Sequence, residues 1–478
     1  MTYFYCRLLG VGLVLGLCGA PAARAATPAP RPNVLFILAD DLGWGDVGFH
    51  GSEIKTPHID RLAAAGARLE QFYVQPVCSP TRASLMTGRY PIRYGLHLGV
   101  VRPWAQYGLP LDERTLPQAL QEAGYETAIT GKWHLGHFEP AYLPTRRGFT
   151  HQYGHYNGAL DYNTHERDGG FDWHRDDKVN RDEGYSTHLI AREASRLITA
   201  HDPAKPLFLY VPFNAVHAPH QVPERYTEPY AQLKGARRTY AGMLAAMDEA
   251  IGQIISALEQ KGLRDNTLIF FCSDNGGPNP GVVTSNGPLR AAKGTVYEGG
   301  VRVPAVAAWT GKIKPGSVVA APLHMVDWYP TLLTLAGVSL AQKHPLDGRN
   351  AWPAITQGAP SPHADILHNV TQNGGAVRAG DWKLVVNGNV ADSEEGGGEA
   401  GAAPRKKAKR SAAAGGAPLI ELFNIRTDPY EKSNVAAQHP EVVQDLRARL
   451  TVYTQAAVPS KQAPAPAGFK VPAVWGEK

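Results

Sequence analysis

Short, uninterrupted runs of apolar residues constrain the fold of this chain more than any other feature of its sequence. The clearest runs are residues 33–38, 207–211, 267–271 and 303–309. Each has the length of a strand, and strands without polar alternation are buried on both faces, as in a parallel sheet covered by helices. Helical segments such as residues 115–124 and 239–260 stand between the runs. This alternation predicts an α/β domain with a mostly parallel sheet.

The length of the chain and its later segments predict a second, smaller domain. A chain of 478 residues exceeds what one hydrophobic core usually supports. We assign a large domain, the candidate catalytic domain, to residues 26–340, a C-terminal subdomain to 341–460 and an extended tail to 461–478. Short strand-like segments at 366–369, 375–378, 382–386 and 419–424 predict a small antiparallel sheet, followed by a helix over 440–455. Residues 391–418 are rich in Gly, Ala, Glu and Lys, which predicts a disordered insertion.

The N-terminus has the features of an export signal over residues 1–25. Arg7 precedes an apolar stretch at 8–20, and Ala23-Arg24-Ala25 forms a small-x-small cleavage site. The apolar stretch is shorter than the ~20 residues that a spanning helix needs. We therefore expect an exported protein, periplasmic or secreted, without a membrane segment after cleavage; a retained anchor is the alternative.

The charge of the chain gives no ground for a nucleic-acid partner. Lys and Arg number 48 against 43 Asp and Glu, and the run at 405–410 alone carries five positive charges. The surplus therefore comes from one local run, not from a basic surface.

Polar side chains follow the predicted strands at their carboxyl ends, where ligands bind in open α/β sheets. They are Asp40, Asp41, Lys132, His134, His217, Asp274 and Asn275, with Lys293 further along the chain. Three carboxylates and one amide oxygen form a hard-oxygen set suited to Ca²⁺ or Mg²⁺, whereas the sequence has no Cys/His cluster for zinc. Taken singly, adjacent aspartates after a strand are more often a turn or a helix cap, and a lone His or Lys is usually a surface or core residue.

A cysteine stands at the start of a distinctive segment, Cys78-Ser79-Pro80-Thr81-Arg82. Ser79 can cap a helix that Pro80 opens and Gly88 closes, which would put Cys78 just ahead of a helix N-terminus. Such a position favours an anion, and Arg82 adds a fork for oxygen ligands. A thiolate nucleophile with a lowered pKa is one interpretation of Cys78. A disulfide with Cys272, the other cysteine left after signal removal, is another.

The string Cys78-x-Pro80-x-Arg82, continued by Ala-Ser-Leu-Met-Thr-Gly-Arg, resembles the signature of type I sulfatases, in which the cysteine is oxidised to formylglycine. Five further places in the chain resemble the pattern of the same family: Asp40-Asp41, Gly131-Lys132-Trp133-His134, His217, Ser273-Asp274-Asn275-Gly276-Gly277 and Lys293. The resemblance implies an alkaline-phosphatase-like fold and the hydrolysis of sulfuric esters. Residues 145–149, 161–162 and 205–210 resemble most closely the arylsulfatase B branch, the N-acetylgalactosamine-4-sulfatases.

The resemblance also implies a role for each site residue. One divalent ion, Ca²⁺ or alternatively Mg²⁺, would be held by Asp40, Asp41, Asp274, Asn275 and the modified residue Cys78. Hydrated formylglycine would attack sulfur while His217, together with Lys293, protonates the departing alcohol, and His134 would then take a proton so that sulfate leaves. Arg82 and Lys132 would hold the diol, and Lys132 and Lys293 would neutralise the sulfate oxygens. A formylglycine-generating enzyme is the implied partner before folding.

The sequence leaves the substrate open. Tyr153, Tyr156, Tyr162 and Trp173 could stack on sugar rings, or equally pack inside the protein. We expect a sulfated carbohydrate, with 4-sulfated N-acetylgalactosamine as the specific hypothesis, or an aryl sulfate. Two alternatives stay open: a phosphonate or phosphodiester hydrolase on the same fold, and a secreted glycan-binding protein without turnover if Cys78 is not oxidised.

Overall fold

The computed structural model describes residues 1–5, 31–389 and 417–477. A ten-stranded sheet forms the centre of the fold. Its strand order is β13-β2-β12-β11-β1-β10-β4-β5-β8-β9. The sheet belongs to the unit Arg31–Lys478, and Met1–Pro30 forms a separate unit. The predicted signal cleavage region and the predicted insertion, with its basic run, lie outside the described residues except for residues 1–5 and 417–418.

The four central strands are parallel neighbours. They are β11 (Thr267–Ser273), β1 (Asn33–Ala39), β10 (Leu207–Pro212) and β4 (Glu126–Lys132). Every residue of β1 and β11 is buried, as expected of strands covered on both faces. Strand β12 (Ala305–Ala308) pairs with β11 antiparallel, so the sheet is mixed but mostly parallel at its centre, and the predicted sheet is confirmed.

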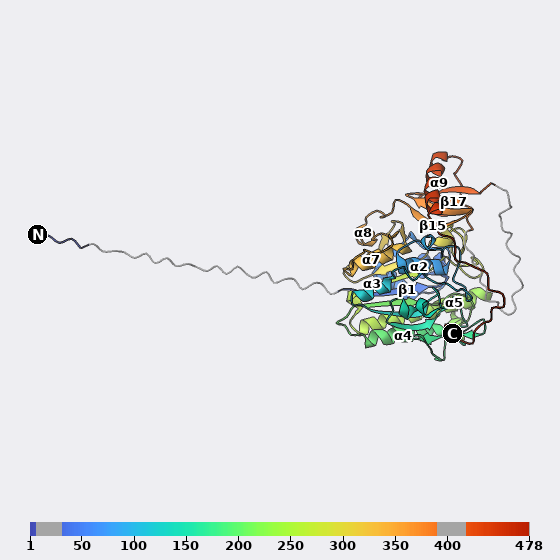
Figure 1. The fold of residues 1–478 in the computed structure, drawn as a ribbon, viewed down its shortest axis with the longest axis horizontal. Helices are drawn as coiled ribbons and strands as arrows, with labels where there is room; N and C mark the ends of the chain where they lie inside the picture. Colours follow the sequence, from blue (N-terminus) through green and yellow to red (C-terminus); the bar gives the residue numbers. More distant parts are fainter. Residues whose placement is uncertain (6–30, 390–416, 478) are drawn as a thin grey trace. The chain divides into compact units, whose positions relative to one another are not determined.

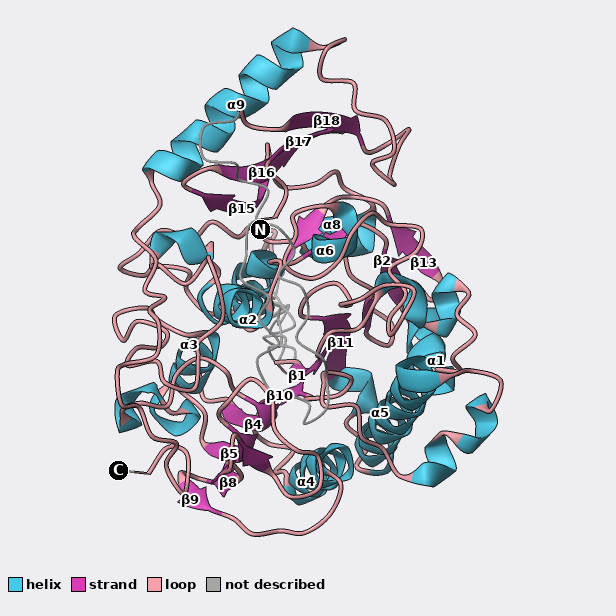
Figure 2. Cartoon of the chain, turned by 90° about the vertical axis from the view of Figure 1, so that its right-hand side faces the viewer, coloured by secondary structure: helices cyan, strands magenta, loops and turns pink. Residues whose placement is uncertain are grey.

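Helices cover both faces of this sheet (Figure 1, Figure 2). Phe36 and Leu38 of β1 point into a core that includes residues of α2 (Cys78–Thr87), α3 (Leu116–Glu122) and α7 (Trp328–Leu335). Leu35 and Ile37 point into the opposite core, with residues of α1 (Pro57–Ala65), α4 (Ser186–Ala200) and α5 (Gly235–Gln260). Among the described residues, α5 alone is long and apolar enough to cross a membrane, and 67% of its most apolar window is buried in the protein.

The remaining short elements lie around this layered centre. They are β2 (Ala67–Leu69), β3 (Phe72–Tyr73), β5 (His151–His155), β6 (Glu166–Arg167), β7 (Gly170–Phe171), β8 (His174–Arg175), β9 (Lys178–Val179), α6 (Glu298–Val301), β13 (Ser317–Val319), β14 (Leu323–His324) and α8 (Trp352–Gln357). Residues 67–73 form two strands that belong to different sheets. The first, β2, lies in the large sheet, and the second, β3, pairs with β14.

A second sheet lies near the C-terminal end of the chain, as predicted. Strands β15 (Ile366–Thr371), β16 (Gly374–Ala379), β17 (Trp382–Val386) and β18 (Ile420–Asn424) pair antiparallel in sequence order. Helix α9 (Pro440–Gln455) packs Leu446 and Leu450 against the apolar side chains of this sheet. The predicted domain boundary near residue 340 stays a prediction.

Beyond α9, residues 458–476, which we call the C-terminal segment, run back along loops of the α/β domain. Val458 N–H donates to Ile92 O at 2.9 Å, and Trp475 N–H donates to Phe171 O at 2.9 Å. Trp475 is 3% exposed and donates from its indole Nε1 to Arg167 O at 2.9 Å. The segment predicted as an extended tail is therefore hydrogen-bonded along the α/β domain.

Candidate active site at the carboxyl ends of the central strands

Three buried carboxylates meet where β1 and β11 end. Asp40 and Asp41 follow β1, and Asp274 follows β11; all are at most 1% exposed. Asp41 N–H donates to Asp274 Oδ1 at 3.3 Å, and Asn275 Nδ2 donates to Asp41 Oδ1 at 2.6 Å. Strands β1 and β11 are parallel, with Ala39 beside Ser273, so both strands end at the same edge of the sheet. The carboxylates that follow them therefore lie close together.

Each carboxylate has a cation of its own. Lys132 Nζ lies 2.5 Å from Asp40 Oδ2, and Lys293 Nζ lies 2.8 Å from Asp41. Arg82 donates from Nε and Nη2 to Asp274 Oδ2 at 3.1 and 2.8 Å, while its Nη1 donates to Lys132 O at 3.0 Å. Burial opposes ionisation of Asp41, but Lys293 and His217 hold its pKa below the usual range.

These oxygen donors fit a divalent cation. Asn275 Oδ1 is buried and has no hydrogen-bond partner among the described residues, so an oxygen lone pair beside Asp41 is left for another ligand. Burial and the neighbouring Asp274 raise the pKa of Asp40 to about 7, so a cation that binds between these carboxylates would favour the ionised form of Asp40. Carboxylate and amide oxygens are the ligands of Ca²⁺ and Mg²⁺.

His217 lies with three predicted metal ligands in one close group of ligand atoms. Single ligand atoms of Asp40, Asp41, Cys78 and His217 all lie within 4.8 Å of one another. His217 Nε2 lies 3.6 Å from Asp41 Oδ2. The sequence assigned His217 to proton transfer, and the structure also places it at the edge of the metal-competent group.

Cys78 lies inside this group. It is 1% exposed, and its thiol Sγ donates to Asp40 Oδ1 at 3.5 Å. Burial and the charge of Asp274 raise the pKa of the thiol well above its usual value, which disfavours the thiolate interpretation. Both Cys78 and Cys272 are free and buried, which removes the disulfide alternative.

The helix start differs from the sequence prediction. Helix α2 begins at Cys78 with Val77 at the cap position, and no side chain caps it. Ser79 does not cap the helix because its hydroxyl donates to His134 O at 2.9 Å and accepts from Val101 N at 2.9 Å. Gly88 ends the helix in the left-handed conformation with φ 66°, as predicted.

One ring nitrogen of His134 is hydrogen-bonded, and the other has no hydrogen-bond partner among the described residues. Its Nε2 lies 3.1 Å from Val101 O, and its Nδ1 is buried without a hydrogen-bond partner among the described residues. Burial and the charge of Lys132 lower the pKa of His134 well below its usual value, so the ring is neutral. The carbonyl of Val101 therefore holds the proton on Nε2 and leaves Nδ1 as an acceptor. No sequence motif marks Val101 or the second role of Ser79; their contacts arise only from the folded loops.

His217 has a similar arrangement. Its Nδ1 lies 2.6 Å from Ala218 O, so Nε2 faces Asp41 as the free acceptor. Burial lowers the pKa of His217 well below its usual value despite the opposing charge of Asp41.

The aromatic residues of the 152–174 segment pack inside the protein. Tyr153, Tyr156, Tyr162 and Trp173 are each at most 1% exposed. Tyr153 and Trp173 stack edge to face, with ring centroids 5.3 Å apart. Of the two alternatives left open by the sequence, the structure favours packing over an exposed sugar platform.

Comparisons with known proteins agree on one family. The sequence model of the family described as Sulfatase matches residues 32–338. Mouse (Mus musculus) arylsulfatase J is 40% identical over 467 residues, which cover 91% of this chain and 77% of the mouse protein. Human (Homo sapiens) arylsulfatase A is 36% identical over 403 residues, 78% of each chain.

Solved structures show the same architecture. Ps i-CgsB has a TM-score of 0.78 and 31% identity, covering 90% of this chain and 94% of its own, and is also known in complex with k-i-k-neocarrahexaose. A phosphonate monoester hydrolase of Agrobacterium radiobacter, at 21% identity and a TM-score of 0.61, shares the fold. The core has the alkaline-phosphatase-like α/β fold. The chain belongs to the sulfatase family and is an arylsulfatase-type sulfuric ester hydrolase.

Proposed function

We propose that this sulfatase removes sulfate from a sulfated carbohydrate, specifically from 4-sulfated N-acetylgalactosamine, and accepts small aryl sulfates as artificial substrates. The observation that carries the catalytic part is the meeting of Asp40, Asp41 and Asp274, each with its own cation, around residue 78. A sulfate ester repels an incoming nucleophile through its oxygens, so a cation-rich, buried site is what its hydrolysis requires.

One divalent ion, Ca²⁺ or alternatively Mg²⁺, would be held by Asp40, Asp41, Asp274 and Asn275 beside residue 78. When bound, it would supply positive charge that neutralises sulfate oxygens. Lys132, beside Asp40, and Lys293, beside Asp41, would add their charges, and Arg82 would fix Asp274 through its two hydrogen bonds to Oδ2. Formylglycine formed from Cys78 would supply a hydrated aldehyde as the nucleophile.

The histidines would move the protons. His134 Nδ1, left as an acceptor by the Val101 carbonyl, would take a proton from the hydroxyl at position 78. His217 Nε2 would carry the proton that reaches the departing alcohol, with Lys293 beside the same carboxylate as its helper. A neutral His134 ring with Nδ1 as acceptor agrees with its role in taking up a proton. His217 would have to gain a proton at Nε2 before it donates, and the carboxylate of Asp41, 3.6 Å away, favours that protonated form.

Relatives support a carbohydrate substrate. Mouse N-acetylgalactosamine-6-sulfatase is 37% identical over 375 residues, and Ps i-CgsB binds an oligosaccharide in its complex. The resemblance of residues 145–149, 161–162 and 205–210 to the arylsulfatase B branch favours the 4-sulfate. The 6-sulfate is the second candidate because of the N-acetylgalactosamine-6-sulfatase relatives.

A panel of sulfated oligosaccharides tests the substrate. The enzyme would be incubated with matched disaccharides that carry sulfate on position 4 or on position 6 of N-acetylgalactosamine, and released sulfate would be measured. Faster release from the 4-sulfate supports the proposal; faster release from the 6-sulfate selects the second candidate. Paired rates on an aryl sulfate and an aryl phosphate or phosphonate ester test the rival hydrolase, which requires the phosphorus ester to be the better substrate.

Oxidation of Cys78 and export are also part of the proposal. Formylglycine-generating enzyme would act before folding, because Cys78 is 1% exposed in the folded chain. Intact-mass analysis of the peptide that contains Cys78 would show a lower mass after conversion, and an unconverted peptide would favour the glycan-binding alternative. N-terminal sequencing of protein recovered from the periplasm or medium would test cleavage after Ala25.

A further inference from the structure

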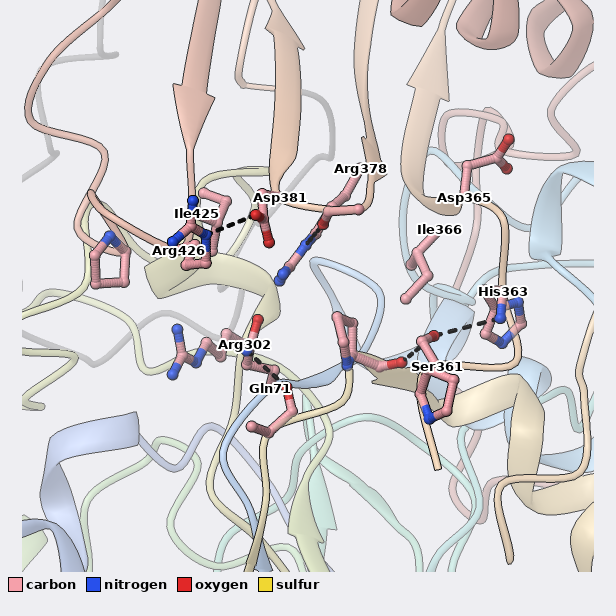
Figure 3. A pocket seen from close by; sticks show the side chains of 15 residues that line it. Gln71, Arg302, Ser361, His363, Asp365, Ile366, Arg378, Asp381, Ile425 and Arg426 are labelled. Atoms are coloured by element: carbon pink, nitrogen blue, oxygen red, sulfur yellow. Dashed lines mark hydrogen bonds and ion pairs between the residues drawn. The ribbon is translucent and has the colours of Figure 1, made fainter. Parts of the chain in front are cut away.

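A pocket of about 640 Å³ lies where the C-terminal sheet meets the α/β domain (Figure 3). Arg378, Asp381 and Arg426 line it from the C-terminal sheet and the turn after β18, and Gln71, Arg302 and Ser361 line it from the other side. The lining contains none of the residues assigned to metal binding or catalysis. The pocket is therefore separate from the candidate active site.

Arg378 is a buried cation without an ion-pair partner. It is 4% exposed, its Nε donates to Gly380 O at 3.0 Å and its Nη1 donates to Tyr73 Oη. No described carboxylate lies within ion-pair distance of it, and its Nη2 makes no hydrogen bond to the described residues. A guanidinium keeps its charge at all ordinary pH values, and buried charges are normally paired. Arg378 therefore has unused binding capacity.

The charges behind Arg378 do not neutralise it. Tyr73 Oη donates to Glu298 Oε2 at 2.9 Å, and Lys383 Nζ lies 2.8 Å from Glu298 and 2.9 Å from Glu431. With Arg302, whose Nη1 lies 3.5 Å from Glu298, the group around Glu298 and Glu431 contains three cations and two carboxylates; the carboxylate of Glu70, also near Arg302, has Arg68 as its own partner. Even with both carboxylates ionised, one positive charge remains. Burial raises the pKa of Glu431 to about 7, so protonation of Glu431 increases the surplus near neutral pH.

The carboxylates that line the pocket are already engaged. Asp381 accepts from Arg426 Nε at 2.7 Å, and Asp365 accepts from Arg449 at 2.9 Å and from Tyr453 at 2.6 Å. Figure 3 shows the Arg426–Asp381 pair at the end of the strands, with Arg378 beside it and Arg302 below. Arg302 is 8% exposed and donates from Nε to Glu70 O, which leaves its Nη2 without a hydrogen bond to the described residues.

We propose that this pocket binds an oxyanion, a sulfate group, through the guanidinium groups of Arg378 and Arg302. Guanidinium groups match tetrahedral oxyanions with parallel N–H donors, and such charge-assisted hydrogen bonds are strong. The volume is large enough for a sugar that carries the sulfate, since ligand pockets usually measure about 300–1,000 Å³. The sulfate is either the free inorganic ion or an ester on a sulfated glycan; the second source rests on the proposed function.

Selenate, which has the shape and charge of sulfate and scatters anomalously, is the direct probe. Crystals of the full chain would be soaked in sodium selenate. We expect an anomalous peak within hydrogen-bond distance of Arg378 and Arg302, and its loss in Arg378→Gln. The same peak should persist in Lys343→Gln, a surface control whose lysine pairs with Asp112. An empty pocket in the wild type, or an unchanged peak in Arg378→Gln, overturns the proposal.

Calorimetry separates the two sources. Sodium sulfate and a 4-sulfated N-acetylgalactosamine disaccharide would be titrated into wild type, Arg378→Gln and Arg302→Gln. If Arg378→Gln does not fold, the Arg302→Gln variant alone provides the comparison with wild type. Loss of one charge-assisted contact should weaken the affected binding event about tenfold or more. Sulfate binding alone assigns the free ion; disaccharide binding that both variants lose assigns the glycan. Binding equal in all three proteins overturns the proposal.

Turnover distinguishes a failure of this proposal from a failure of the proposed function. Arg378→Gln should hydrolyse a small aryl sulfate with a kcat within about twofold of wild type, because Arg378 is outside the catalytic set. A wild type that binds selenate in the pocket but lacks activity on sulfated sugars would reject the proposed substrate and leave the oxyanion site standing.

Discussion

Lys293 Nζ lies 2.8 Å from the carboxylate of Asp41, although 252 residues separate them in the chain. The segment that carries Lys293 is attached to the C-terminal sheet: Arg290 Nη1 donates to Glu421 Oε1 at 3.0 Å, and Val296 N–H donates to Gly388 O at 2.9 Å. Tyr297 also hydrogen-bonds Glu421. The smaller sheet thus contributes to the position of a candidate-site cation, Lys293, in the larger domain.

Replacing Lys293 by methionine should reduce kcat/KM on an aryl sulfate by about 10²–10³, the usual effect of removing one group that stabilises developing negative charge. The side chain is 5% exposed, and methionine keeps much of its packing. Lys343→Met, which removes a surface lysine 68% exposed, is the matched control and should keep wild-type kinetics. Equal kinetics for Lys293→Met and wild type would show that Lys293 does not act in the reaction.

Replacing Cys78 by alanine should abolish sulfate release and leave the protein folded. Among the described residues the thiol makes one long hydrogen bond, to Asp40 Oδ1 at 3.5 Å, and alanine removes only the sulfur atom. Circular dichroism and the thermal midpoint should match the wild type, while activity falls to the background. Loss of the folded state in this variant would contradict the assignment.

Replacing Lys383 by methionine should destabilise the protein by about 3–5 kcal/mol, because it leaves two buried carboxylates without their shared cation. Lys383 is fully buried and lies 2.8 Å from Glu298 and 2.9 Å from Glu431. Urea unfolding measures the effect. Lys343→Met is again the comparison, since an exposed ion pair contributes at most about 1 kcal/mol. A difference between the two variants smaller than that value would be inconsistent with a buried ion-pair network.

Acid should destabilise the protein through buried histidines. Burial lowers the pKa of His97 to about 4 and of His324 to about 3, against 6.5 for an exposed ring. Between pH 6.5 and these values the unfolded chain binds more protons than the folded chain, so stability falls as pH falls. From pH 7 to pH 5 each ring should cost about 2 kcal/mol.

The urea midpoint at the two pH values tests this dependence on histidine. His324→Gln should flatten it, while a control at the partly exposed His439, whose side chain is 38% exposed, should retain the wild-type slope. An identical slope in His324→Gln and wild type would assign the acid sensitivity to other groups.

Replacing Trp475 by alanine should lower kcat with a smaller change in the thermal midpoint. Trp104 Nε1 donates to Ala463 O at 3.1 Å and Lys461 N–H donates to Gly95 O, so the C-terminal segment holds the loop that contains Val101, the carbonyl partner of His134. Trp475 anchors the end of that segment.

Steady-state kinetics and thermal melting should be compared for Trp475→Ala, Trp475→Phe and Lys470→Ala. The phenylalanine variant keeps the packing and should recover much of the kcat, and the exposed Lys470 is the control. Full activity in Trp475→Ala would show that the segment does not position the loop.

The strands and the site were predictable to different degrees. Continuous apolar runs identify β1, β10 and β11 because strands buried on both faces admit no polar alternation. The polar residues that end these strands could therefore be grouped before the fold was known. The cap assigned to Ser79 was wrong because its hydroxyl finds a tertiary partner, His134 O, that no local pattern encodes.

Other contacts had no sequence signal at all. The Val101 carbonyl that orients His134 lies in a loop without periodicity, and a backbone acceptor can come from any residue type. The return of the C-terminal segment to Phe171 depends on backbone pairing between distant loops. Patterns of residue type predict elements and strand ends; they do not predict which loops then touch.

The C-terminal segment also has a consequence for biosynthesis. The ribosome releases residues 458–476 after every residue of the candidate site, and these late residues hydrogen-bond the loop that contains Val101 and the hairpin of β6 and β7. The loop that contains Val101 therefore gains these contacts only after the residues of the candidate site have been synthesised.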